Sequence, residues 1–269
     1  MKNALRRIAG TLITSGCLVA IAQAGPILLI EDQGGFGGAA TVLTNDGFTV
    51  QVVNNEFANG FANLRDTVFL NGFDMVVYGE RGGGVGGIMS VPVQQSLEAY
   101  VQQGGHLLVT GYDTLGSPTD HNLAALMRLN SPGDHVSYDP AWNVANLNHP
   151  ILNGPFGSFQ GLSFSARGYD DDRFTLGAGT IALATMNNQQ VRVSLNDLPG
   201  AAGSVGYWNG GLAGMTSNAQ PDFSSGDNTE DIFLNWGCWA TSCQVVPEPS
   251  TLVLTAFGLA LGAFTRRRR

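Results

Sequence analysis

The feature that most constrains this chain is an alternation of short apolar runs with amphipathic segments over its first half. The clearest of these segments, residues 90–105, has Ser90 before its first turn, Pro92 within that turn, apolar residues at positions 93, 97, 100 and 101, and two glycines at its end. This spacing predicts a helix that is capped by Ser90 and buries one face. The apolar run at 106–111 that follows it predicts a buried strand.

The other segments extend the same pattern. Strands are predicted at 26–33, 48–54 and 73–79, and helices at 35–45, 61–72, 119–129 and 228–239. After residue 131 the chain becomes rich in strands and loops, with antiparallel strands expected at 180–186 and 190–195 and a returning strand at 204–211. Strands separated by helices predict an α/β fold, here a flavodoxin-like parallel sheet with helices on both faces and some antiparallel additions. The helix at 90–105 argues against an all-β adhesive module.

The first 24 residues are typical of a secretory signal. Lys2, Arg6 and Arg7 form a charged start, an apolar stretch follows, and a small-residue site predicts cleavage by signal peptidase between Ala24 and Gly25. The alternative is a lipoprotein signal that ends at Cys17. It is disfavoured because a threonine occupies the position three residues earlier, where a bulky aliphatic residue is usual.

The end of the chain combines an apolar segment with a basic cluster. Residues 252–264 carry no charge, and Arg266–Arg269 close the chain. This segment is shorter than the roughly 20 residues that cross a bilayer comfortably, but it can insert with local thinning of the bilayer. The arginines would then stay on the cytoplasmic side. We therefore expect a C-terminal transmembrane helix that leaves residues 25–245 outside the inner membrane.

Directly before this segment lies Pro247-Glu248-Pro249. The two prolines hold the backbone extended, which is the conformation in which a protease binds its cleavage site. The motif, the apolar segment and the arginine cluster together resemble the PEP-CTERM sorting signal of Gram-negative bacteria. The resemblance implies cleavage near the motif by an exosortase, and transfer from the inner membrane to the cell surface or the exopolysaccharide matrix. The alternative is a plain tail anchor. The expected domains are 1–24 (signal peptide), 25–245 (body) and 246–269 (sorting signal).

The body is strongly acidic. Between residues 25 and 265 there are six arginines, no lysine and 21 acidic residues, which gives 6 − 21 = −15. Such a surface repels nucleic acids, so DNA or RNA is not an expected partner. The two body cysteines, Cys238 and Cys243, are expected to form a disulfide in an oxidising compartment. No further metal ligands lie close to them in sequence, and we expect neither a metal site nor a cofactor.

The body also resembles the class I glutamine amidotransferase-like fold, especially its ThuA-like branch. The resemblance rests on the stretches "FDMVVYG", "LEAYVQQGGHLLVTGYD", "NHPILNG" and "YWNGG" and on a first strand followed by Asp32. It implies a nucleophilic cysteine at the turn after the strand at 106–111. In this chain that position falls at or near Tyr112, and no cysteine is close to it. Glutaminase activity is therefore not expected, and no GxSxG motif replaces it.

Acidic residues lie at the carboxyl ends of three of the predicted parallel strands: Glu31 and Asp32, Glu80, and Asp113. The carboxyl ends of such strands form the usual ligand crevice, and paired carboxylates can serve as acid and base. Two functions follow. The first is a non-catalytic protein that binds or scaffolds matrix components such as exopolysaccharide. The second is a secreted carbohydrate-active hydrolase that uses these four carboxylates.

Three further features bear on binding. His149, within "NHPILNG", is expected to tie its loop by hydrogen bonds rather than to act chemically. The acidic run at 169–174 is interpreted as a solvated turn, with Ca²⁺ binding as the alternative. The aromatic residues Trp142, Tyr207 and Trp208 suit sugar stacking, although burial in a core explains them equally well.

Overall fold

The computed structural model describes residues 25–31, 37–81, 89–112, 115, 121–133, 139–166, 172–187, 189–197, 202–209 and 228–243. All of them belong to one compact unit, Gln23–Val245. The expected signal helix and membrane helix lie outside the described residues, as do both expected cleavage sites. Within the described ranges, no helix has the length and apolar character that crossing a membrane requires.

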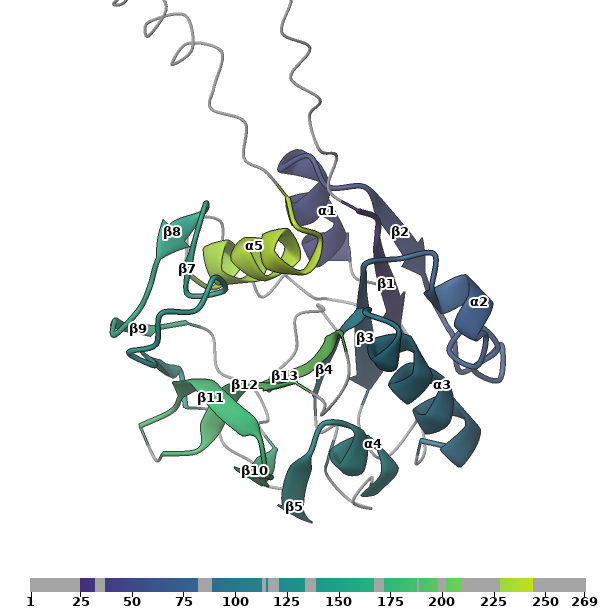
Figure 1. Cartoon of the computed structure of the whole chain (residues 1–269). Coiled ribbons are helices and arrows are strands. Elements are labelled where there is room, and N and C mark those ends of the chain that lie inside the picture. Colours follow the sequence, from purple (N-terminus) through teal and green to yellow (C-terminus); the bar gives the residue numbers. More distant parts are fainter. Residues whose placement is uncertain are drawn as a thin grey trace, which may run out of the picture. The chain divides into compact units, whose positions relative to one another are not determined.

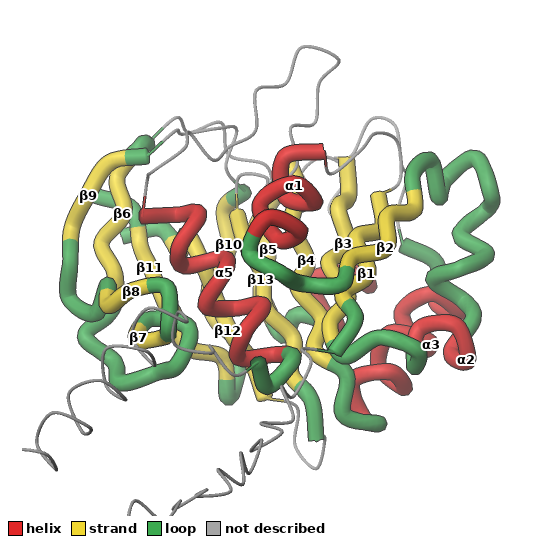
Figure 2. Tube along the Cα trace, turned by 90° about the horizontal axis from the view of Figure 1, so that it is seen from above, coloured by secondary structure: helices red, strands yellow, loops and turns green. Residues whose placement is uncertain are grey.

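A nine-stranded sheet forms the centre of this unit, in the order β2-β1-β3-β4-β13-β12-β11-β6-β9 (Figures 1 and 2). The parallel strands are β1 (Ile27–Glu31), β2 (Val50–Val53), β3 (Met75–Arg81), β4 (His106–Tyr112) and β13 (Ser204–Asn209). The antiparallel additions are β12 (Val191–Asp197), β11 (Thr180–Thr185), β6 (Ala141–Val144) and β9 (Ser163–Ser165). With β13 as the fifth parallel strand, the order is that of a flavodoxin-like sheet.

Two small ribbons accompany the sheet. One pairs β5 (Leu129–Gly133) with β10 (Arg173–Leu176), and the other pairs β7 (Asn153–Gly154) with β8 (Gly157–Ser158). Both are antiparallel. The expected antiparallel pair at 180–186 and 190–195 is confirmed as β11 and β12.

Helices cover both faces of the sheet, as predicted. Figure 1 shows α1 (Gly37–Asn45) and α5 (Asn228–Ala240) on one side, and α2 (Thr67–Leu70), α3 (Val91–Gln102) and α4 (His121–Leu126) on the other. Strand β1 shows how the two faces of the sheet are both buried. Its Ile27 and Leu29 join the core under α1 and α5, while Leu28 and Ile30 join the core under α3 and α4. A strand buried on both faces is therefore apolar throughout.

The helix predicted at 61–72 is wrong over its first half, because only Thr67–Leu70 is helical. The carboxylate of the buried Glu56 accepts hydrogen bonds from the backbone N–H groups of Asn63 (2.6 Å) and Leu64 (3.1 Å). Phe61 has a positive φ of 58°. These bonds fold the segment into successive turns, and the long-range partner Glu56 carries no periodic signal.

The helix at 90–105 is confirmed, with its apolar positions 93, 97, 100 and 101 buried. Ser90 occupies the N-cap position with extended dihedral angles, but its side chain forms no capping hydrogen bond, contrary to the prediction. The helix predicted at 119–129 ends at Leu126. It stops because Arg128 adopts a left-handed conformation (φ 52°) and the chain turns into β5.

Candidate functional site

The carboxyl ends of the parallel strands form one edge of the sheet, where open α/β sheets bind ligands. At this edge the strand register pairs Glu31 of β1 with Gly79 of β3, and Glu80 of β3 with Gly111 of β4. Glu31 is fully buried. The backbones of Glu31 and Glu80 therefore lie on neighbouring strands at the same edge. Asp32 and Asp113 lie outside the described residues, so the convergence of the four carboxylates stays a prediction.

A buried polar cluster, absent from the predictions, lies further along this edge. Tyr207 Oη donates a hydrogen bond to the Asp172 carboxylate. The backbone N–H of Asp172 donates to Asn209 Oδ1 (2.9 Å), and Asn209 Nδ2 donates back to the Asp172 carbonyl (2.9 Å). All three residues are at most 2% exposed. We call Asp172, Tyr207 and Asn209 the strand-end cluster.

The strand-end cluster corrects the interpretation of the acidic run at 169–174. Asp172 is not part of a solvated turn, because the hydroxyl of Tyr207 takes the place of water at its carboxylate. The types of these residues only weakly indicate that they form a buried cluster. Tyr207 and Asn209 alternate on the predicted returning strand, but their partner is 35 residues or more away in sequence.

Arg192 of β12 lies beside this cluster and is also buried. Its guanidinium donates to the backbone carbonyls of Asn209 (3.5 Å) and Asp139, and lies 5.8 Å from the centre of the Trp142 ring. Carbonyl oxygens and an aromatic face therefore stabilise a cation inside the protein. Its position within the apolar strand "VRVSL" was the available signal that this arginine is internal.

The aromatic residues that suit sugar stacking are packed in the interior. Trp142, Tyr207 and Trp208 are all buried. Trp142 stacks on Phe164 with ring centroids 5.7 Å apart and lies 5.0 Å from Trp208. Their faces are occupied by neighbouring rings, so the sugar-stacking interpretation is wrong for these three residues.

The α3–β10 cleft is a second candidate site, with a volume of about 1000 Å³. It lies between α3, α4 and the β5–β10 ribbon. Its polar lining consists of Glu98, Gln102, His121, Arg128, Asn130, Arg173 and Thr175. This cleft carries no local sequence signal, because its residues come from α3, α4, β5 and β10, and only the β5–β10 pairing brings β10 to the other three. Arginine is scarce in the body, and two of its six arginines line this cleft. Their positions were the available sequence signal for a site here.

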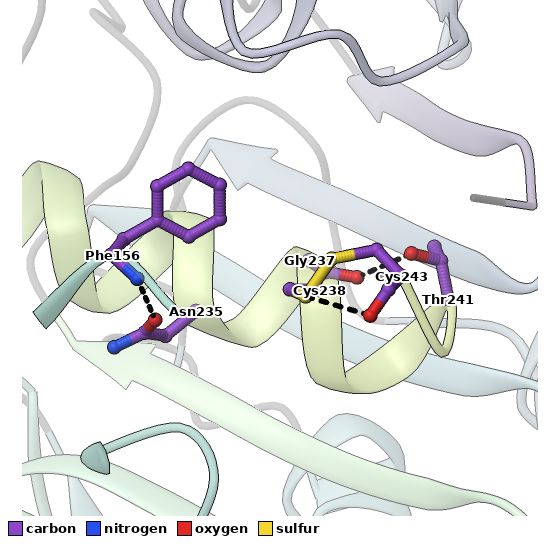
Figure 3. The surroundings of a disulfide bond; sticks show 6 residues. All are labelled: Phe156, Asn235, Gly237, Cys238, Thr241 and Cys243. Carbon is purple, nitrogen blue, oxygen red and sulfur yellow. Dashed lines mark hydrogen bonds between the residues drawn. A yellow bond between two sulfur atoms is a disulfide. The ribbon is translucent and has the colours of Figure 1, made fainter. Parts of the chain in front are cut away.

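Cys238 and Cys243 form a disulfide that closes the last turn of α5 (Figure 3). Both cysteines of the body are thus bonded to each other, and the described part of the chain offers no free thiol. It also contains no cluster of three or more residues able to hold a metal ion. The nucleophile of a glutaminase is therefore missing from the described residues.

The "NHPILNG" turn follows the predicted arrangement. His149 Nδ1 accepts a hydrogen bond from the backbone N–H of Ile151 (3.2 Å), and its ring lies 5.2 Å from that of Trp239 on α5. The histidine ties its loop, as expected. Nearby, Asn235 of α5 accepts a hydrogen bond from the N–H of Phe156 (2.9 Å; Figure 3) and donates one to the carbonyl of Gly157 (3.1 Å). These contacts fix α5 against the β7–β8 ribbon.

Taken together, the order of the parallel strands and the helices on both faces of the sheet define a flavodoxin-like α/β body. The tail adds a second identification, because residues 245–269 match the family model described as the PEP-CTERM protein-sorting motif. The chain carries this sorting motif, as the sequence resemblance indicated. The motif implies exosortase-dependent export to the surface of a Gram-negative cell.

Solved structures of similar fold place the body among known architectures. It is similar to a cytoplasmic protein from Salmonella typhimurium (TM-score 0.58, 16% identity, 79% of this chain and 98% of that chain). It is also similar to the mmIFT52 N-terminal domain (0.56, 13%, 82% and 100%) and to a ThuA-like protein from Parabacteroides merdae (0.53, 17%, 84% and 94%). Glutamine amidotransferases are among the further structural neighbours. At these identities the likeness concerns the fold alone. A sequence search of curated proteins gives no match.

Proposed function

We propose that this chain is a non-catalytic surface protein whose body binds or scaffolds a component of the extracellular matrix, with carbohydrate as the ligand. Signal peptidase would release the chain at Gly25, and an exosortase would cut near Pro247-Glu248-Pro249. The membrane segment would hold the protein only until this second cut. The sorting motif supports the destination, and the body supports binding rather than catalysis.

The observation that carries the proposal is the state of the strand-end cluster. In the position where an α/β enzyme places its reactive groups, Asp172, Tyr207 and Asn209 are buried and hydrogen-bonded to one another. Groups that hold each other in place give a rigid edge rather than an accessible acid or base. The α3–β10 cleft offers an open polar surface instead.

The carbohydrate-active hydrolase remains the second candidate, and one observation favours it. The register places the backbones of Glu31 and Glu80 on adjacent strands at the same edge, one residue apart in register, and a hydrolase of this kind needs two carboxylates close together. If the two are joined there by Asp32 and Asp113, an acid and a base are available.

Binding and turnover of the host's own exopolysaccharide separate the two functions. The full chain, purified in detergent, is titrated with this polysaccharide by calorimetry, and release of reducing ends is followed in parallel. We expect binding without release. Release that is lost in Glu31→Gln, Asp32→Asn, Glu80→Gln or Asp113→Asn, and kept in the surface control Asp46→Asn, would establish the hydrolase instead.

The sorting step has its own test. Replacement of Pro247, Glu248 and Pro249 by alanine in the host is expected to leave the protein in the membrane fraction with its tail attached. Intact-mass measurement of surface-extracted wild-type protein should give a mass that lacks both ends. A full-length mass for the extracted protein would reject both cleavages.

A further inference from the structure

We infer that the α3–β10 cleft binds the carboxylate groups of an acidic glycan, with Arg128 and Arg173 as the residues that recognise them. This inference rests on the proposed function, because it names the ligand class and the site of a body that binds carbohydrate.

Small side chains create the space of the cleft. Ala124 and Ala125 of α4, and Gly177 with Ala178 beyond β10, contribute little volume to its lining. The resulting 1000 Å³ lies at the upper end of the range of about 300–1,000 Å³ that ligand pockets occupy. The cleft therefore has room for more than a single sugar ring.

The two arginines reach the cleft from different elements. On β10, the exposed Arg173 and Thr175 alternate with the buried Phe174, so both present their side chains to the cleft while Phe174 packs on Tyr207. Arg128 is anchored through its backbone. Its carbonyl accepts hydrogen bonds from Gly177 N (2.8 Å) and Thr180 Oγ1 (3.1 Å), which hold its left-handed conformation.

These guanidiniums differ from the other arginines whose side chains the structure describes. Arg65 donates to the carbonyls of Gly60 and Phe61, and Arg192 is buried against carbonyls. Within the described ranges, the guanidiniums of Arg128 and Arg173 form no hydrogen bond or ion pair. Both remain available for a ligand.

The charge of the cleft selects an anion. In a chain whose residues 25–265 carry a net charge of −15, the described part of the cleft lining holds two arginines and one acid, Glu98. It is therefore a local positive site in an acidic surface, and such a site concentrates anionic ligands. A guanidinium matches the planar geometry of a carboxylate with two parallel hydrogen bonds.

The remaining polar groups favour a sugar acid over a phosphate. Gln102, Asn130 and Thr175 can donate to and accept from hydroxyl groups, and the carboxylate of Glu98 accepts hydroxyl protons. The same Glu98 repels a doubly charged phosphate. The surrounding acidic body also repels nucleic acid, whose charges continue beyond any single cleft. A uronic-acid residue of a polysaccharide combines one carboxylate with several hydroxyls, as this lining requires.

The test uses two probes that differ only in charge. The full chain in detergent is titrated by calorimetry with oligogalacturonate and with the same oligomer fully methyl-esterified. We expect the acid to bind and the ester to bind at least about ten-fold more weakly, since a charge-assisted hydrogen bond is lost at each esterified group. Free galacturonate and inorganic phosphate, as competitors, separate a chain site from a single-sugar site and from a general anion site.

Three variants assign the site. Arg128→Gln and Arg173→Gln should each weaken oligogalacturonate binding about ten-fold or more. Arg173→Lys should weaken it as well, because an ammonium lacks the paired geometry. The matched control Arg65→Gln should bind as the wild type does. Far-UV circular dichroism on every variant establishes that the fold is kept.

Several outcomes would overturn the inference: no binding of oligogalacturonate, equal binding of acid and ester, full competition by phosphate, or an equal loss in Arg65→Gln. If the host polysaccharide still binds while Arg128→Gln and Arg173→Gln have no effect, only the proposed site fails and the proposed function stands. If the cleft variants lose binding but the wild type cleaves the host polysaccharide, only the non-catalytic function fails.

Discussion

The indole of Trp236 on α5 packs directly against Gly206 of β13. Trp236 is fully buried, and an added Cβ at Gly206 would lie less than 3.0 Å from two carbons of its ring and 3.2 Å from the Ser194 carbonyl oxygen. Carbon atoms pack best at about 3.5–4.0 Å. Gly206→Ala therefore forces the buried indole to retreat by at least about 0.5 Å.

Overpacking of this kind typically costs about 1–3 kcal/mol. Trp236→Phe removes the ring carbons that clash, and alone it should cost part of the about 3–5 kcal/mol that complete loss of such a side chain costs. In the double variant the clash is relieved. The double variant should therefore be more stable than the sum of the two single effects predicts, by about 1 kcal/mol or more.

Urea unfolding of residues 25–245, followed by far-UV circular dichroism, measures all three variants on the same scale. Circular dichroism is preferred because the substitution removes a fluorophore. Additive effects within about 0.5 kcal/mol would refute the reasoning, since they would mean that Gly206 and Trp236 do not constrain each other.

Three other perturbations test the packing around α5 and α3. Replacing Cys238 and Cys243 by alanine should lower the free energy of unfolding by about 2 kcal/mol, the loop-closure contribution expected for a separation of 5 residues, and should abolish the effect of dithiothreitol on the urea midpoint. Asn235→Ala leaves the N–H of Phe156 and the carbonyl of Gly157 without their partner and should cost about 1–3 kcal/mol, measured in the same way; an unchanged midpoint would contradict the role assigned to this amide. Burial, and secondarily the charge of Asp74, raises the pKa of Tyr100 well above its ordinary value of 10.0, so the neutral phenol stabilises the folded state. This stabilisation is complete below about pH 10 and is lost as the pH rises toward the raised pKa, by up to about 1.4 kcal/mol per pH unit. Tyr100→Phe should therefore remove this part of the loss of stability at alkaline pH. Identical profiles of unfolding free energy against pH for the wild type and Tyr100→Phe would refute this role of Tyr100.

The parallel half of the fold was largely predictable from the sequence. The strands at β1, β3 and β4 and the helix α3 carry their own local signals, because strands buried on both faces are continuously apolar and a helix is marked by its apolar spacing and glycine stop. The segment before α2 was not predictable in this way. Its conformation depends on Glu56, whose carboxylate binds backbone groups seven and eight residues later.

The candidate sites also differ in how far they could be predicted from the sequence. Acidic residues at strand ends can be read from the order of strands, and the structure brings the backbones of Glu31 and Glu80 to one edge. The strand-end cluster and the α3–β10 cleft could not be predicted, because each joins segments that are far apart in sequence. Asp172 and Tyr207 are 35 residues apart, and Arg128 and Arg173 meet only because β5 pairs with β10.

The position of β13 has a consequence for how the chain matures. It is the last strand in sequence among the described residues, yet it is the sole link in the sheet between the parallel strands and the antiparallel ones. In a chain that leaves the ribosome, or crosses a membrane, amino end first, the parallel and antiparallel parts of the sheet therefore cannot be joined by hydrogen bonds until Asn209 has emerged. Completion of the nine-stranded sheet therefore waits until most of the body is available.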